Sequence, residues 1–385
     1  MKIGTLLRKL AIRFVVLLVL FLGVMSIINC SGHRSLRAEL AQWEQAGLLL
    51  EPERGDGRAW REAEAAYATL SRQAVQLLNE GPDEDAELRQ LALDETAEAR
   101  AAIAEAVGQT GTLPIDADAA FDEQVEQRLQ RLAYVRQFTG LLDGAARTYA
   151  AQGRPHDAAA ALQTLGRLSA YVGRDASLVA HLVRLAMDAQ LLASMHAVYA
   201  DARLHPPDGL PAALAATDYA RRFNDMLRGE AAMVPAFIDS EQQARVARGW
   251  WQHDQRYTLE HKRALIHAIG QGTPLRELAI PTDDDHPWWS RSAGVILPAI
   301  DDAREQTLRV AAKRGQALVA LRLREHRRET GAYPDSLAAA LGDEPDATLL
   351  DPFTGQAFDY QRHGEGFVLT ATTGDGEAVT WRWDE

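Results

Sequence analysis

The sequence predicts a mainly α fold: one N-terminal membrane helix, an extracytoplasmic helical bundle, and a small C-terminal α+β module with a three-stranded antiparallel sheet. Three observations predict it. Apolar residues recur at three- and four-residue spacing through most of the chain, which is the periodicity of a helix. An uninterrupted apolar run covers residues 14–28. Alternation of period two is confined to residues 358–361, 366–372 and 378–383, where it indicates short strands.

The composition is that of a globular protein with two or three domains. The chain has 385 residues, of which 47% are hydrophobic and 25% are charged, and such a length can bury a substantial core. Its 54 acidic residues outnumber its 41 basic residues, giving a net charge of −13. A polyanion would need a basic surface, so nucleic acid is excluded as the main partner.

Residues 1–32 are expected to form a cytoplasmic basic flank and a signal anchor, with residues 11–32 in the membrane. Basic residues precede the apolar run, which predicts a single-pass inner-membrane protein with its bulk in the periplasm. Two alternatives stay open, a cleaved signal peptide and a lipoprotein with its lipid on Cys30. Asn29 departs from the small residue that a lipobox has before its cysteine. The retained anchor is therefore favoured.

Residues 33–114 are predicted to form amphipathic helices at 35–50, 58–79 and 83–107, separated by breaks that contain proline and glycine. Their alternating charges are typical of a solvated helix face.

Residues 115–297 are predicted to form a bundle of helical hairpins. Helices are expected at residues 116–153, 158–172, 177–199, 212–228 and 238–269. The stretch 145–159, a helix that ends at glycine before a second helix of small residues, is similar to half of a tetratricopeptide repeat. Because no regular 34-residue period accompanies it, a repeat array is not supported.

The longest irregular stretch, residues 273–289, is a candidate site for chemistry. Its polar and aromatic residues are Asp283, Asp285, His286, Trp288 and Trp289. Carboxylates and an imidazole could bind a divalent cation, and paired tryptophans could stack on a sugar. Consecutive side chains diverge, however, and no second cluster completes a ligand shell. A solvated acidic turn is the favoured interpretation, with an envelope hydrolase or a sugar-binding protein as the alternative.

Residues 298–385 are predicted to be a long helix followed by the sheet module. The turn positions expected to be structural are Gly331, Pro334, Asp351, Pro352, Gly355, Gly374 and Gly376. Gly331 can take the left-handed conformation that ends a helix, and the carboxylate of Asp351 can accept backbone N–H bonds in the turn before the first strand. The expected core of this module is Leu318, Val319, Leu337, Phe353, Phe358, Tyr360, Phe367, Leu369 and Trp381.

The order of motifs at the C-terminus resembles the globular half of the major pseudopilins of type II secretion. A long helix leads to YPDSL at 333–337, DPFTG at 351–355, an aromatic strand and a TTGDG hairpin at 372–376. The resemblance implies that Asp375 is a calcium ligand, although this turn is shorter and lacks the family's glycine pair. Residues 33–314 separate the membrane segment from the module, so the chain is not expected to be a pilin subunit.

The whole arrangement also resembles membrane-anchored proteins of planctomycetes and some proteobacteria that have no assigned activity. No nucleophile elbow, phosphate-binding glycine loop, HExxH or CxxC motif is present. The favoured function is a non-enzymatic scaffold that binds a protein partner, linked to an envelope or secretion-like assembly. No cofactor is expected beyond the calcium that the pseudopilin resemblance implies.

Overall fold

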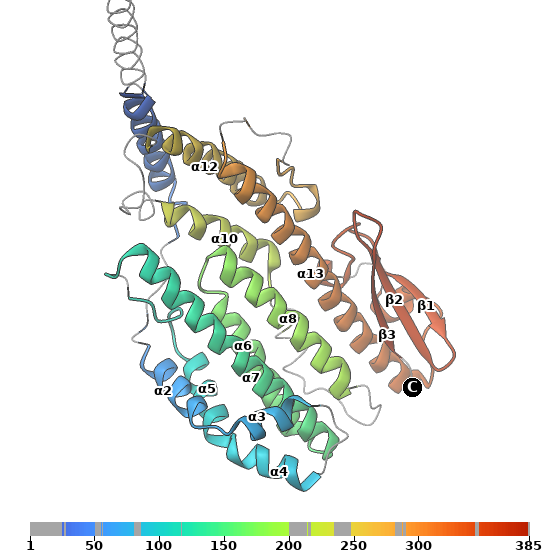
Figure 1. Ribbon diagram of the computed structural model, residues 1–385. Coiled ribbons are helices and arrows are strands. Elements are labelled where there is room, and N and C mark those ends of the chain that lie inside the picture. Colours follow the sequence, from blue (N-terminus) through green and yellow to red (C-terminus); the bar gives the residue numbers. More distant parts are fainter. Residues whose placement is uncertain are drawn as a thin grey trace, which may run out of the picture.

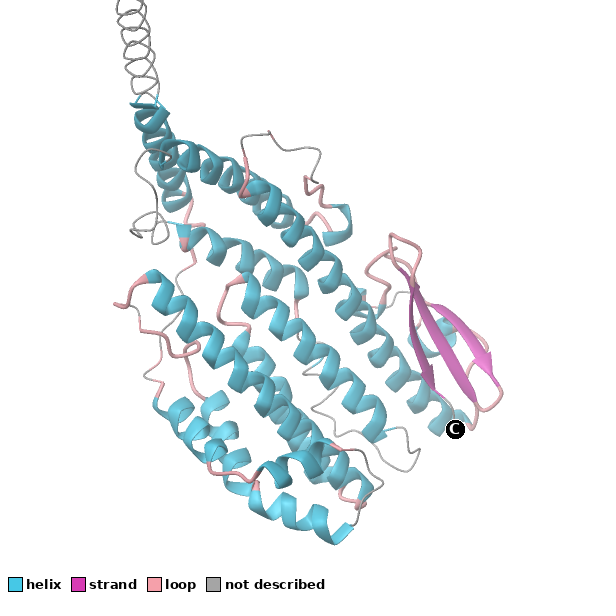
Figure 2. Cartoon of the chain, in the orientation of Figure 1, coloured by secondary structure: helices cyan, strands magenta, loops and turns pink. Residues whose placement is uncertain are grey.

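The protein is mainly helical and ends in a small three-stranded antiparallel sheet, which confirms the predicted fold class at this level (Figure 1, Figure 2). This computed structural model describes residues 25–26, 28–50, 55, 57–80, 86–116, 118–199, 214, 217–234, 248–281, 287, 290–342 and 346–383. Most of the predicted membrane segment lies outside the described residues.

The described chain begins in a helix over residues 28–45. The other helices are α2 (Arg58–Ala68), α3 (Arg72–Asn79), α4 (Ala86–Glu95), α5 (Ala97–Gly108), α6 (Phe121–Ala151), α7 (Pro155–Val172), α8 (Leu178–Tyr199), α10 (Tyr219–Ala232), α12 (Arg248–Gly270), α13 (Ala293–Thr330) and α14 (Leu337–Leu341), with 3-10 turns η1 (Leu275–Glu277) and η2 (Ala347–Leu349).

Two of the predicted helices are each divided in two. The hydroxyl of Ser71 accepts the backbone N–H of Ala74 and caps a new helix, so residues 58–79 form α2 and α3. The stretch 83–107 is divided at Thr96, whose hydroxyl donates to the carbonyl of Ala92, and yields α4 and α5.

Helix α13 is 38 residues long and takes part in two hydrophobic cores. The first core contains residues of helices α2 through α8, of the second half of α13 and of the sheet. The second core joins the helix over residues 28–45 with α10, α12, η1 and the first half of α13. The predicted boundary between residues 297 and 298 therefore falls inside a continuous helix, and the sheet shares its core with the bundle.

The sheet has the order β1 (Asp359–His363), β2 (Gly366–Thr372), β3 (Ala378–Trp383), and both pairs are antiparallel. It packs on α13, where the buried amide of Gln316 donates to the carbonyls of Leu369 at 3.2 Å and Val379 at 2.6 Å. Gly315 permits the close approach, since a Cβ there would lie 2.8 Å from the ring of Phe358. Strand β3 is an edge of the sheet.

The expected core of the module is buried except at two positions. Phe353 and Tyr360 are only partly buried and pack against the core from its border. The hydroxyl of Tyr360 donates to the carbonyl of Pro334 at 2.8 Å, so the polar end of this side chain is hydrogen-bonded at the border of the core.

The start of α13 is capped by a side chain from α12. The buried carboxylate of Asp254 accepts the hydroxyl of Ser290 and the backbone N–H groups of Ser292 at 2.7 Å and Ala293 at 3.3 Å. These N–H groups have no partner inside the helix, so a carboxylate from another element satisfies them.

We predict that Asp254→Ala lowers the free energy of unfolding by about 2 kcal/mol, because it leaves buried donors unpaired. Urea denaturation measures the loss, and hydrogen exchange should show faster amides at the start of α13. Asp302→Ala, at an exposed position of the same helix, is the matched control. Equal stability of the two variants would contradict the capping role.

Candidate functional site

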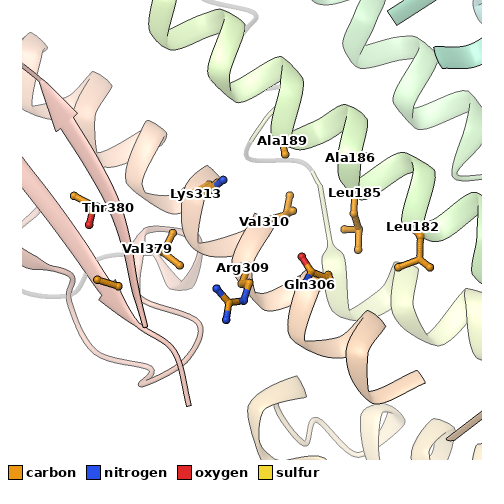
Figure 3. A pocket seen from close by; sticks show the side chains of 11 residues that line it. Leu182, Leu185, Ala186, Ala189, Gln306, Arg309, Val310, Lys313, Val379 and Thr380 are labelled. Carbon is orange, nitrogen blue, oxygen red and sulfur yellow. The ribbon is translucent and has the colours of Figure 1, made fainter. Parts of the chain in front are cut away.

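A groove of about 550 Å³ lies between α8, α13 and β3. Figure 3 shows side chains of α8 on one side, those of β3 on the other, and those of α13 between them. Its lining residues are Leu182, Leu185, Ala186, Ala189, Gln306, Arg309, Val310, Lys313, Ala378, Val379 and Thr380. The three walls come from segments far apart in the sequence.

Helix α8 forms the apolar wall. Val179 is 45% exposed and Leu182 is 39% exposed, and Ala186, Ala189 and Ala193 continue this stripe at spacings of four, three and four. Among the described residues, α8 is the one helix that length and composition would allow to cross a membrane, but 56% of its most apolar window is buried in the protein. It packs against α6, α7, α10 and α13. Its exposed stripe is apolar, whereas the exposed face of a surface helix usually carries polar or charged residues.

Strand β3 forms the polar wall. The imidazole Nε2 of His196, on α8, donates to the carbonyl of Arg382 at 2.7 Å, so this carbonyl points away from β2. In an antiparallel strand the N–H and C=O of alternate residues point to the same side. The backbone groups of Ala378 and Thr380 therefore also point outward, toward the groove. In the described part of the chain, no residue outside the sheet bonds to them.

The floor of the groove belongs to α13 and carries two cations of different kinds. Arg309 forms ion pairs with Glu305 at 3.2 Å, Asp375 at 3.1 Å and Glu377 at 2.8 Å. Lys313, one helical turn further on, is exposed and has no ion-pair partner among the described residues. The groove thus has one satisfied and one available positive charge.

The carboxylate of Asp375 is engaged by its own hairpin. It accepts the hydroxyl of Thr373 and the backbone N–H of Glu377, and these two bonds lower its pKa. Its second oxygen pairs with Arg309. The guanidinium of Arg309 thus lies beside Asp375, the residue that the pseudopilin resemblance implies is a calcium ligand. Within the described ranges, no three His, Cys, Asp or Glu side chains gather as a metal site.

The five candidate residues of the predicted loop site, Asp283, Asp285, His286, Trp288 and Trp289, lie outside the described residues. Cys30 is described and lies exposed near the start of the helix over residues 28–45.

The turn before β1 is organised by Asp351, which is buried. Its carboxylate accepts the backbone N–H of Phe353 at 2.9 Å and the hydroxyl of Thr354 at 3.1 Å. Its carbonyl accepts the N–H of Gly355 at 2.7 Å, and Pro352 is partly buried within the turn. Of the turn glycines, Gly331, Gly355 and Gly376 have positive φ, whereas Gly374 does not.

A buried polar cluster that was not predicted from the sequence lies among α7, α8, α10 and α13. The carboxylate of Asp188 accepts the hydroxyls of Ser169 and Tyr219. Burial, with Asp188 beside it, raises the pKa of Tyr219 well above its usual value. The guanidinium of Arg314 lies 4.8 Å from the centre of the Tyr219 ring. The only available signal was polar residues at buried positions of an apolar helix.

His181 belongs to the same helix interface and has a defined tautomer. The hydroxyl hydrogen of Thr307 is donated to the carbonyl of Ala303, so the Thr307 oxygen accepts from Nε2–H of His181 at 2.9 Å. Burial, together with the nearby cation of Arg184, lowers the pKa of His181 to about 4. The imidazole is neutral at pH 7.

In comparisons with known proteins, no family model, no curated protein and no solved structure matches this chain. The geometry of the groove is therefore the basis for assigning a function.

We predict that Asp351→Ala makes residues 340–385 protease-sensitive while the helical middle stays resistant, because the lost acceptor costs about 1–3 kcal/mol locally. Limited proteolysis with mass spectrometry of the fragments measures this. Asp359→Ala, at an exposed position of β1, is the control. Identical fragments from Asp351→Ala and wild type would refute the turn role. If calcium chelation of wild type reproduces the variant's pattern, calcium belongs to the module.

We predict that His181 makes the protein less stable as the pH falls from 6.5 to 4. Below pH 6.5 the unfolded chain binds a proton that folded His181 does not bind until about pH 4, so the free energy of unfolding decreases, by about 3 kcal/mol at most. Urea denaturation at several pH values compares wild type with His181→Gln, in which this contribution is absent. Parallel pH profiles for the two proteins would show that His181 titrates normally.

Proposed function

We propose that this protein is a scaffold, tethered to the inner membrane, that binds a protein partner in the groove between α8, α13 and β3. One observation carries the proposal: an apolar helix stripe and an unpaired strand edge face each other across the same groove. A polypeptide can satisfy both walls, since it supplies main-chain hydrogen bonds and apolar side chains together.

The tether that we propose is the signal anchor at residues 11–32. The helix over residues 28–45 begins within the last part of this segment and packs beside α12, where the side-chain oxygen of Asn29 accepts the N–H of Gly249 at 2.6 Å. The sheet lies at the opposite end of α13 from this helix (Figure 1). An anchor at the N-terminus would therefore hold the groove away from the bilayer, in the periplasm. A lipid on exposed Cys30 would have the same geometrical effect.

The bundle supports a scaffold role through its consecutive helix packing. Helix α6 packs against α7 and α7 against α8, as expected for helical hairpins of the loosely tetratricopeptide-like kind. This packing leaves the outer stripe of α8 available while the rest of the helix is fixed in the core.

We predict that Leu182→Asp abolishes capture of the partner from bacterial membranes by full-length protein. A carboxylate on the apolar wall would have to be desolvated by the bound chain, and this cost opposes binding. Quantitative mass spectrometry of cross-linked complexes compares the variant with wild type. Leu129→Asp is the matched control, because Leu129 is a 53% exposed leucine on α6, which does not line the groove. Equal capture by all three proteins would exclude the groove as the binding site.

A further inference from the structure

We infer that the groove binds the extended C-terminal end of its partner, which adds to β3 as a parallel strand and places its terminal carboxylate beside Lys313. This inference rests on the proposed function, since it names the class of partner for the same groove.

The strand edge selects an extended main chain. Ala378 and Thr380 each direct one N–H and one C=O into the groove, because they alternate with Arg382, whose carbonyl is bonded by His196 on that side. Unpaired edges of this kind are templates for another strand. A helix could not satisfy them, because its own backbone groups are already paired.

The helix wall selects apolar side chains. Every other residue of a strand added to β3 would point toward the floor and the α8 stripe, where Leu182, Leu185 and Val310 lie. Leu182 is the most exposed of these three, at 39%. The bound segment should therefore carry apolar residues at alternate positions.

One end of the groove is closed by a packed junction. At the closed end the ring of His196 packs edge-on against Trp381 and Trp383 at 5.0 and 5.4 Å between ring centres, and it bonds to Arg382. At the other end Arg309 pairs with the β2–β3 hairpin at Asp375 and Glu377. A chain that continued past the closed end would meet this packed junction, so the junction favours a chain that stops.

The charge at the closed side fits a chain terminus. Lys313 is the lining residue of α13 furthest along the helix toward the His196 junction, and Figure 3 shows it on the side of Ala189, with Arg309 and Gln306 toward the other end. Arg309 is already bonded to three carboxylates, whereas Lys313 has no partner among the described residues. A terminal carboxylate would form an ion pair with Lys313. Because α13 and β3 run in the same direction, such a peptide would lie parallel to β3.

The test uses the full-length protein in detergent and a library of heptapeptides displayed with free C-termini. The strongest peptide is then synthesised as the free acid, as the C-terminal amide, and in two forms N-methylated at odd or at even amides. Fluorescence polarisation measures the Kd of each. We expect amidation to weaken binding by about tenfold and one of the two methylated forms to bind at least tenfold more weakly than the other.

Three variants of the protein test which residues cause the differences in peptide binding. In Lys313→Gln the difference between acid and amide should fall to about twofold, because the ammonium that reads the carboxylate is gone. Leu182→Asp should bind no selected peptide, and Leu129→Asp should bind as wild type does.

Three results of the binding measurements, and two combinations with membrane capture, would overturn the inference. The first is equal binding of acid and amide by wild type, and the second is equal binding of both methylated forms. The third is a concentration-dependent dimer that Leu182→Asp abolishes, since a second copy would then occupy the groove. If no peptide binds while membrane capture still depends on Leu182, the inference fails and the proposed function stands. If capture does not depend on Leu182, both fail.

Discussion

The structure depends on helix α13, whose two halves are buried in two different hydrophobic cores. The first half of α13 packs into a core with α10 and α12, and its second half packs into a core with α8 and the sheet. Apolar burial is the main favourable contribution to folding, and here one helix receives it from both cores. The floor of the groove is therefore part of a rigid element, and its side chains keep fixed positions relative to the strand edge and the α8 stripe.

Apolar packing alone would not fix the rotation of α13, and three buried polar contacts do so. Asp254 caps its first turn, Arg314 donates to the carbonyl of Thr217 from its middle, and Gln316 reaches two carbonyls of the sheet. Each contact is costly to break, because burial leaves no water to replace the lost partner. Their positions along the helix orient Arg309 and Lys313 toward the groove.

Local patterns could be predicted from the sequence, whereas the groove could not. Period-two alternation gave β2 and β3 with the bounds that the structure shows, and Gly331 marked the end of α13. The division at Ser71 was not predicted, because the apolar residues keep helical spacing on both sides of the serine that caps α3. The groove depends on how α8 and α13 pack and on which side of β3 remains unpaired. These are tertiary properties that leave no mark in a linear pattern. The loop at Asp283 and Asp285, the strongest linear signal for chemistry, lies outside the described residues.

The shared direction of α13 and β3 has a mechanical consequence. Contacts from Arg309 to Glu377, from Gln316 to Val379 and from Arg324 to the ring of Trp383 follow one another in the same order along both elements. A chain bound in the proposed direction would leave the groove at the hairpin end, which is also the end toward which the N-terminus of α13 points. A tensile force between the N-terminal end of the molecule and this chain would load the pairing from that one end. Its hydrogen bonds would then open one after another, and the attachment would release under force more readily than its equilibrium affinity suggests.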